Sequence, residues 1–149
     1  MKLAVLINLI VMLVFPFYVD AQMGMKFRGS DGWGIQSQYE RFFNNYSLNR
    51  YYGKITEIDT ITPMHDMGSG IQLKLKGDRE EYIVHLGPSW FIIHQDMSLG
   101  INENVEIKGC KVAINGKPVI MAAEMRRKDN ILYLRDQDGI PYWSMWRKK

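Results

Sequence analysis

Cysteine is almost absent from this sequence of 149 residues, which contains only Cys110. A single cysteine cannot form an internal disulfide, and no C-x-x-C-H motif is present, so covalent attachment of a c-type haem is excluded. Cys110 lies in the alternating stretch "VEIKGCKVAI". We therefore interpret it as a residue packed in a strand rather than as a reactive thiol.

Catalytic motifs are also missing. The sequence has neither a P-loop nor a dinucleotide-binding fingerprint. Its three histidines form no pair at positions i and i+4, and the acidic residues of the predicted strands are interleaved with lysines and arginines, as on solvent-exposed faces. These observations predict that the protein is not an enzyme and that it needs no cofactor.

The stretch "HLGPSWFIIHQ" (His85–Gln95) resembles a nucleophile site only superficially, because it lacks the second glycine of a G-x-S-x-G elbow. Gly87 is expected to end a strand, and Ser89 is a favoured N-cap for a helix that runs to about Met97. We expect three apolar residues of this helix to close one end of a barrel: Trp90, Phe91 and Ile93.

The first residues predict export. Lys2 precedes an apolar run of about 17 residues, Leu3–Val19, and small residues follow at Val19-Asp20-Ala21. This layout is typical of a secretory signal peptide over residues 1–21. The alternative is an uncleaved anchor, although a spanning helix needs roughly 20 apolar residues. We expect a mature chain of 149 − 21 = 128 residues, beginning at Gln22, in the periplasm or an equivalent compartment, with no stable membrane span.

The remainder divides into a lead, a barrel and a tail. Residues 22–48 combine a glycine-rich lead with a short amphipathic helix, predicted from Tyr39, Phe42, Phe43 and Tyr46 at i, i+3, i+4 and i+7. From Asn49 the apolar period changes to two, and Asn115-Gly116 is a strong hairpin signal. Three strands, a short helix and two or three further strands predict an all-β, five- to six-stranded OB-fold barrel over residues 49–136. An open sandwich is the alternative, and residues 137–149 form an aromatic, basic tail.

A loop rich in sulfur and nitrogen ligands offers one metal hypothesis. Met64, His65 and Met67 lie together in "PMHDM" (Pro63–Met67), and thioether and imidazole ligands suit copper. Methionine is also ordinary core filler. No metal site is therefore predicted, and these three residues are the candidate ligands if copper binds.

Aromatic and basic residues concentrate near the two ends of the chain. Tryptophan, tyrosine and arginine are enriched where protein interfaces concentrate their binding energy. The candidate partner-binding residues are Trp33, Arg126, Arg127, Tyr142, Trp143, Trp146 and Arg147. If the end segments fold back on the barrel, they are latches. If they do not, they are docking arms for a partner protein.

Several stretches carry a resemblance to known proteins. "YYGKITEI", "VHLGPSWFI", "VEIKGCKVAINGKPVIMAAE" and "LRDQDGIPYWS" resemble a group of small exported bacterial OB-fold proteins, over roughly Tyr52 to Trp146. That resemblance implies fold and compartment rather than an activity. The chain also looks like small accessory subunits of exported respiratory oxidoreductases, such as the component that organises nitrite oxidoreductase into tubules. This resemblance implies a protein partner and is compatible with self-assembly.

The sequence thus favours a non-catalytic exported OB-domain protein that acts as a protein-binding adaptor or assembly subunit. The alternative is a barrel that binds copper, a polyanionic glycan or an oligonucleotide. Nucleic acid is not expected, because the second and third strands offer few aromatic residues among their basic ones.

Overall fold

Alternation of apolar and polar side chains produces six strands in the computed structural model, which describes residues 31–145. The predicted signal peptide, the lead up to residue 30, Trp146 and Arg147 lie outside the described residues. The strands are β1 (Leu48–Ile61), β2 (Gly70–Lys76), β3 (Glu81–Pro88), β4 (Asn104–Ile114), β5 (Lys117–Arg127) and β6 (Asn130–Tyr133). The helical elements are η2 (Glu40–Phe42), α2 (Ser89–Ile92) and η3 (Tyr142–Met145).

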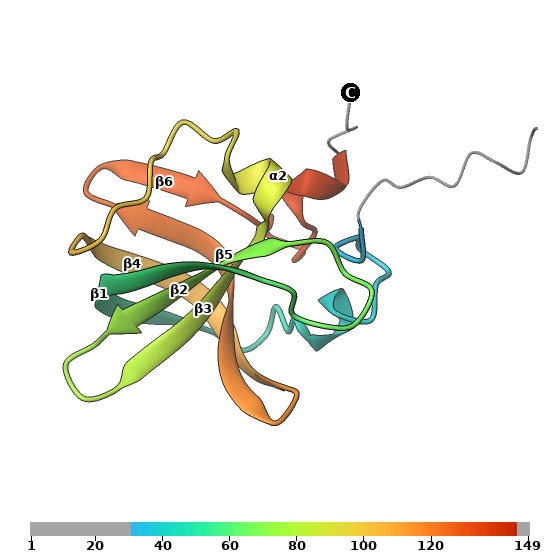
Figure 1. The fold of residues 1–149 in the computed structure, drawn as a ribbon, viewed down its shortest axis with the longest axis horizontal. Helices are drawn as coiled ribbons and strands as arrows, with labels where there is room; N and C mark the ends of the chain where they lie inside the picture. The colour runs from blue at the N-terminus through green and yellow to red at the C-terminus, as the bar shows by residue number, and fades with distance from the viewer. Residues whose placement is uncertain (1–30, 146–149) are drawn as a thin grey trace, which may run out of the picture.

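The sheet closes on itself (Figure 1). β1 pairs antiparallel with β2 and β4, β2 pairs with β3, and β4 pairs with β5. A parallel contact between β3 and β5, Val84 opposite Ile120 and His85 opposite Met121, completes a ring of five strands. With α2 between β3 and β4, this is the strand order of the OB-fold. The predicted fold class is confirmed, and the alternative of an open sandwich is wrong.

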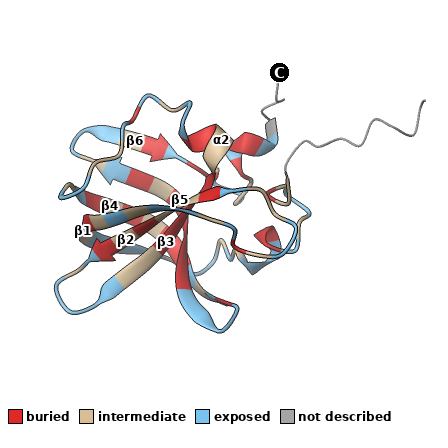
Figure 2. Ribbon diagram, viewed as in Figure 1, coloured by how far each residue is buried: buried red, intermediate tan, exposed pale blue. Residues whose placement is uncertain are grey.

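Buried and more exposed residues alternate along parts of the strands (Figure 2), and the buried ones form the core of the barrel. Leu73, Leu75, Val84 and Leu86 are fully buried, as the period of two requires for strands with one face in the core. Cys110 is buried in the same way, as predicted. At the β4–β5 hairpin, Asn115-Gly116 adopts positive φ angles of 53° and 75°, so this turn prediction is also confirmed.

The predicted helices are shorter than expected. The aromatic stripe that begins at Tyr39 gives a single 3-10 turn, η2, because Phe43 already has an extended backbone. Tyr39 is buried, whereas Tyr46 is 99% exposed, so the stripe does not share one face. Among residues 31–145, no helix has the length and apolar character that crossing a bilayer requires.

The turn after β3 also differs from its prediction. The N-cap of α2 is Pro88 rather than Ser89, the helix ends at Ile92 rather than near Met97, and the Ser89 hydroxyl has no hydrogen-bond partner among the described residues. Phe91 enters the core as expected. Ile92 is buried in place of Ile93, which is 70% exposed.

Candidate functional site

The segments on either side of the barrel pack against it and against each other. Trp33 and Trp143 are both buried, with their ring centroids 6.2 Å apart. The indole nitrogen of Trp143 donates a hydrogen bond to the Trp33 carbonyl at 2.7 Å, and that of Trp33 donates to the Gly68 carbonyl at 3.0 Å. A buried indole offers no surface to a partner. Trp33 and Trp143 therefore act as latches here, which is one of the two alternatives for the end segments.

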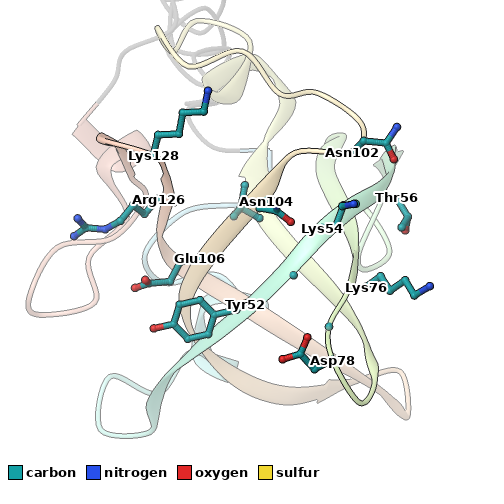
Figure 3. Close-up of a pocket in the computed structure, with 13 residues that line it drawn as sticks. Tyr52, Lys54, Thr56, Lys76, Asp78, Asn102, Asn104, Glu106, Arg126 and Lys128 are labelled. Carbon is teal, nitrogen blue, oxygen red and sulfur yellow. The ribbon is translucent and has the colours of Figure 1, made fainter.

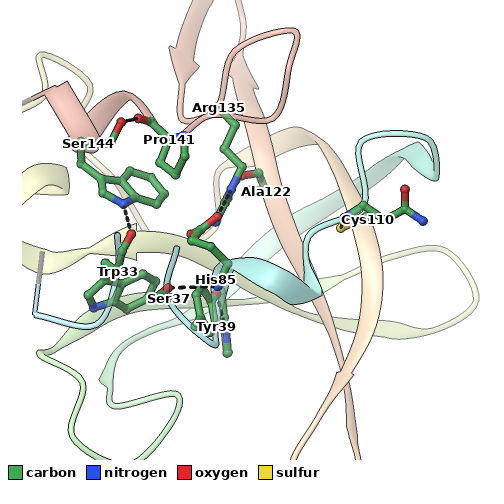
Figure 4. A network of polar contacts seen from close by, with 12 residues as sticks. Trp33, Ser37, Tyr39, His85, Cys110, Ala122, Arg135, Pro141 and Ser144 are labelled. Carbon is green, nitrogen blue, oxygen red and sulfur yellow. Dashed lines mark hydrogen bonds and ion pairs between the residues drawn. The ribbon is translucent and has the colours of Figure 1, made fainter. Parts of the chain in front are cut away.

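A buried ion pair holds the same two segments together. Arg135 donates to both carboxylate oxygens of Glu40, at 2.7 and 3.2 Å, and to the carbonyl of Ala122 on β5. Its guanidinium carbon lies 4.6 Å from the ring centroid of Phe43 and 4.9 Å from that of Trp143. Burial raises the pKa of Glu40, and Arg135 opposes this shift. One arginine thus connects the N-terminal segment, the barrel and the C-terminal segment (Figure 4).

A polar chain continues from this ion pair into the barrel wall. The Tyr39 hydroxyl lies 3.1 Å from Nδ1 of His85, and Nε2 of His85 lies 3.2 Å from Oε1 of Gln72. Burial lowers the pKa of His85 to about 4, and the charge of Arg135 acts in the same direction. The pKa of Tyr39 is raised by burial. At neutral pH His85 is therefore uncharged and Tyr39 keeps its proton.

The strand β6 leaves one side of the sheet open. Among the described residues it pairs only with β5, at the end of the sheet order, and a groove of about 460 Å³ runs along it. We name this the edge groove, and its lining residues are Phe91, Gln95, Asp96, Met97, Asn130, Ile131, Leu132, Tyr133 and Tyr142. Tyr133 is 51% exposed and lies beside Tyr142, with their ring centroids 6.4 Å apart. Of the candidate partner-binding residues in the described C-terminal segment, Tyr142 is thus the one whose ring stays accessible.

The two predicted arginines of the β5–β6 hairpin have different surroundings. The Nη1 group of Arg127 bonds both carboxylate oxygens of Glu103, at 3.1 and 2.9 Å, so its charge is compensated. Arg126 is exposed and has no ion-pair partner among the described residues. It lines a broad cavity of about 860 Å³ with Lys54, Lys76 and Lys128 (Figure 3). We name this the basic cavity.

The side chains of the loop proposed to bind copper do not form a common site. Met64 and Met67 pack partly buried against the core, whereas His65 is exposed and pairs with Asp66 at 2.8 Å. Among residues 31–145, no group of three or more histidine, cysteine or acidic side chains is placed to hold a metal ion.

Sequence reasoning missed Tyr133 and Gln72. Tyr133 lies in the strand "ILYLRD", where no sequence feature marks it as a binding residue. Gln72 is one of several polar residues in an alternating strand. Their position depends on pairing between distant segments, and no short motif announces it.

The fold places the protein in the OB class of barrels, which carry their binding surfaces on the outside of the strands and in the connecting loops. More specifically, residues 47–132 match the profile of the MamS/MamX magnetosome protein family, and the chain belongs to this family. The match covers more than half of the chain and ends within β6, so Glu40, Arg135 and the two latch tryptophans lie outside it. A comparison with curated proteins finds no match.

The family agrees with the predicted small bacterial group in general terms, and it is a magnetosome protein family rather than a known enzyme family. No link to nitrite oxidoreductase is shown by this comparison.

Proposed function

We propose that this protein is a non-catalytic accessory protein, exported from the cytoplasm, that holds a partner protein at the open edge of β6. Membership of a magnetosome protein family is consistent with an accessory role. The observation that carries the proposal is the unpaired outer edge of β6 with an exposed pair of tyrosines beside it.

The backbone of β6 supplies the hydrogen-bonding groups. The amide of Leu134, directly after β6, donates to the Ala123 carbonyl at 2.9 Å. Successive residues of a strand direct their backbone groups to opposite sides, so Leu132 faces β5 while Ile131 and Tyr133 face away from it. No described residue bonds the outward groups of Ile131 and Tyr133. Such an edge is a template on which another chain can add a strand.

The side chains around this edge favour an extended peptide segment of a partner. Tyr133 and Tyr142 present rings of the kind that anchor protein interfaces. The floor of the edge groove is apolar at Met97 and Leu132. Asp96 is exposed at the rim and has no ion-pair partner among residues 31–145, which favours a basic residue in the partner segment.

We propose a larger exported oxidoreductase as the first partner to examine, because the sequence resembles accessory subunits of such enzymes. Pairing of two copies of this chain through β6 is the alternative outcome. A contact of two identical edges related by a two-fold axis would close as a dimer.

The test combines a photo-crosslinker with a proline substitution. Benzoylphenylalanine is placed at Tyr133 in cells, and the matched control carries it at Tyr52, which is 61% exposed on β1. We expect one partner protein to crosslink at position 133 and not at position 52, and mass spectrometry identifies it.

In the same experiment Ile131→Pro removes the outward amide, which proline cannot supply. The crosslink at position 133 should fall at least about tenfold while the barrel still unfolds cooperatively. Equal crosslinking from positions 52 and 133, or an unchanged crosslink in a folded Ile131→Pro variant, would contradict the proposal. A crosslink to a second copy of the chain would mean that the protein is a self-assembling subunit and not an adaptor.

Polyanion binding is a second candidate function, and the basic cavity favours it. Lys54, Lys76, Arg126 and Lys128 surround it, and none of these four has an ion-pair partner among the described residues. The acidic side chains of the cavity are Asp78 and Glu106, and Glu106 is already paired with Arg50. A heparin column run at increasing salt tests this candidate, since phosphate- or sulfate-mediated binding weakens steeply with ionic strength.

A further inference from the structure

A second, smaller groove lies where three segments of the chain meet. The end of β1 contributes Ile61 and the following segment Pro63, the β4–β5 hairpin contributes Ile114 and Pro118, and β2 and β3 line the space between them. Its volume is about 320 Å³. The amide nitrogen of Asn115 donates to the Pro63 carbonyl at 3.1 Å and joins the two flanking segments. We name this the hairpin groove.

The polar chain described above ends in this groove. Since Tyr39 keeps its proton and His85 is neutral, the Tyr39 hydroxyl donates to Nδ1 of His85, and Nε2–H of His85 donates to Oε1 of Gln72. The carbonyl end of the Gln72 amide is thereby occupied. Its NH₂ end has no partner among residues 31–145, and Gln72 lines the groove. The polar chain from Tyr39 through His85 to Gln72 thus orients a pair of N–H donors toward a bound molecule.

Among the described residues that line the hairpin groove, the one charged side chain is positive. Lys117 begins β5 at the rim and has no ion-pair partner among the described residues. His85 is the other titratable group of the lining. A molecule in this groove therefore meets apolar walls, N–H donors from Gln72 and an ammonium group, and none of the described lining residues has a carboxylate that would attract a cation.

We propose that the hairpin groove binds a small monocarboxylate with an apolar body, which contacts the isoleucine and proline walls while its carboxylate meets Lys117 and the Gln72 amide. Ligand sites are typically clefts of roughly 300 Å³ or more, mainly apolar with a few placed polar groups. The volume of this groove, at the lower end of that range, fits one small molecule rather than a glycan chain. This site is separate from the edge groove and does not depend on partner binding there.

The probe is 3-phenylpropionate, and the controls with a matched body are 3-phenylpropanol and 3-phenylpropylamine. Each is titrated into the ¹⁵N-labelled full chain while backbone amide resonances are followed by NMR. We expect 3-phenylpropionate to shift the resonances of Gln72, Ile83, Asn115 and Lys117 in a saturable way. The alcohol should bind at least about tenfold more weakly, because hydrogen bonds to a charged acceptor are roughly twice as strong as neutral ones.

Two variants separate the contribution of the Lys117 charge from that of the polar chain that ends at Gln72. Lys117→Met should lower the affinity for 3-phenylpropionate about three- to tenfold. Lys111→Met, on β4 outside the hairpin groove and paired with Glu80, should leave its affinity unchanged. Gln72→Glu keeps an acceptor for Nε2–H of His85 but turns a negative oxygen toward the groove. It should abolish carboxylate binding and create binding of the amine.

Three results would overturn the proposal. They are the absence of saturable shifts at the groove residues, equal affinity for the carboxylate and the alcohol, or equal weakening by Lys117→Met and Lys111→Met. A thermal melt of each variant ensures that only folded protein is compared. Crosslinking at Tyr133 is measured independently, so failure of this site and failure of the adaptor function are distinguishable.

Discussion

Replacement of Glu40 by leucine should destabilise the protein strongly, because it leaves a positive charge buried without its partner. The side chains of Glu40 and Arg135 are only 3% and 1% exposed. Removing one member of a buried ion pair typically costs 3–5 kcal/mol. We expect about 4 kcal/mol for Glu40→Leu, which is a large part of the total stability of a domain of this size, roughly 5–15 kcal/mol.

The double variant Glu40→Leu, Arg135→Met should recover part of this loss. It removes both charges together, although it leaves the Ala122 carbonyl without its donor and removes the guanidinium from the rings of Phe43 and Trp143. An unsatisfied buried acceptor costs about 1–3 kcal/mol. We therefore expect the double variant to be more stable than the sum of the single changes by about 2–3 kcal/mol.

Urea unfolding followed by tryptophan fluorescence measures the four members of this cycle. The matched control is the exposed pair of Lys74 and Glu57, whose nitrogen and oxygen lie 3.4 Å apart. Exposed pairs contribute roughly 0–1 kcal/mol, so its coupling should stay in that range. If the cycle at Glu40 and Arg135 gave a coupling no larger than this control, the ion pair would not be what joins the two end segments to the barrel.

Three further predictions concern other positions. Titration of His85 should lower the free energy of unfolding of the wild type by about 3 kcal/mol relative to a His85→Gln variant as the pH drops from 6.5 to 4, because the unfolded chain takes up this proton across the window and the folded protein, with a His85 pKa of about 4, takes it up only at the end. Equal pH slopes of the two proteins in urea unfolding would refute this. Gly70→Ala should cost about 1–3 kcal/mol and displace Trp33, since the new Cβ would overlap the Cζ2 atom of its ring, and unaltered fluorescence and stability would count against that contact. N-terminal sequencing of protein from its own cells should begin at Gln22, whereas recovery of Met1 would exclude cleavage of a signal peptide.

The barrel was predictable because its signals are local. Alternation of apolar residues marks each strand, and Asn115-Gly116 fixes a turn that requires positive φ. Closure of the ring depends on the contact of Val84 with Ile120, which no local pattern reports. Closure could be predicted only from the order of the strands and the short helix along the chain.

The aromatic residues outside the barrel were less predictable. The spacing of Tyr39 and Phe43 fits a helix, but each residue is held by a separate tertiary contact, Tyr39 by His85 and Phe43 by Arg135. Such contacts override a weak helical pattern. Sequence also could not separate Trp143, which is buried, from Tyr142, which stays exposed, because a 3-10 turn directs neighbouring side chains to different sides.

Both grooves escaped prediction for a related reason. The edge groove exists because β6 ends the sheet, and the hairpin groove because the chain after β1 approaches the β4–β5 hairpin. Each is assembled from segments that are distant in the sequence. The hydrogen bond with His85 occupies the carbonyl oxygen of the Gln72 amide. This contact, which only the structure reveals, indicates which way the free N–H groups of Gln72 point.

The joining of both end segments at one place has a mechanical consequence. Trp33 and Trp143 share a hydrogen bond, and Glu40 and Arg135 share a salt bridge, so the first and last described parts of the chain are attached to each other as well as to the barrel. A pull applied between the two ends would load these few contacts first, one after another, before it reached the ladder of strand hydrogen bonds. The end segments would then lengthen under tension while the barrel, with its grooves, stayed folded.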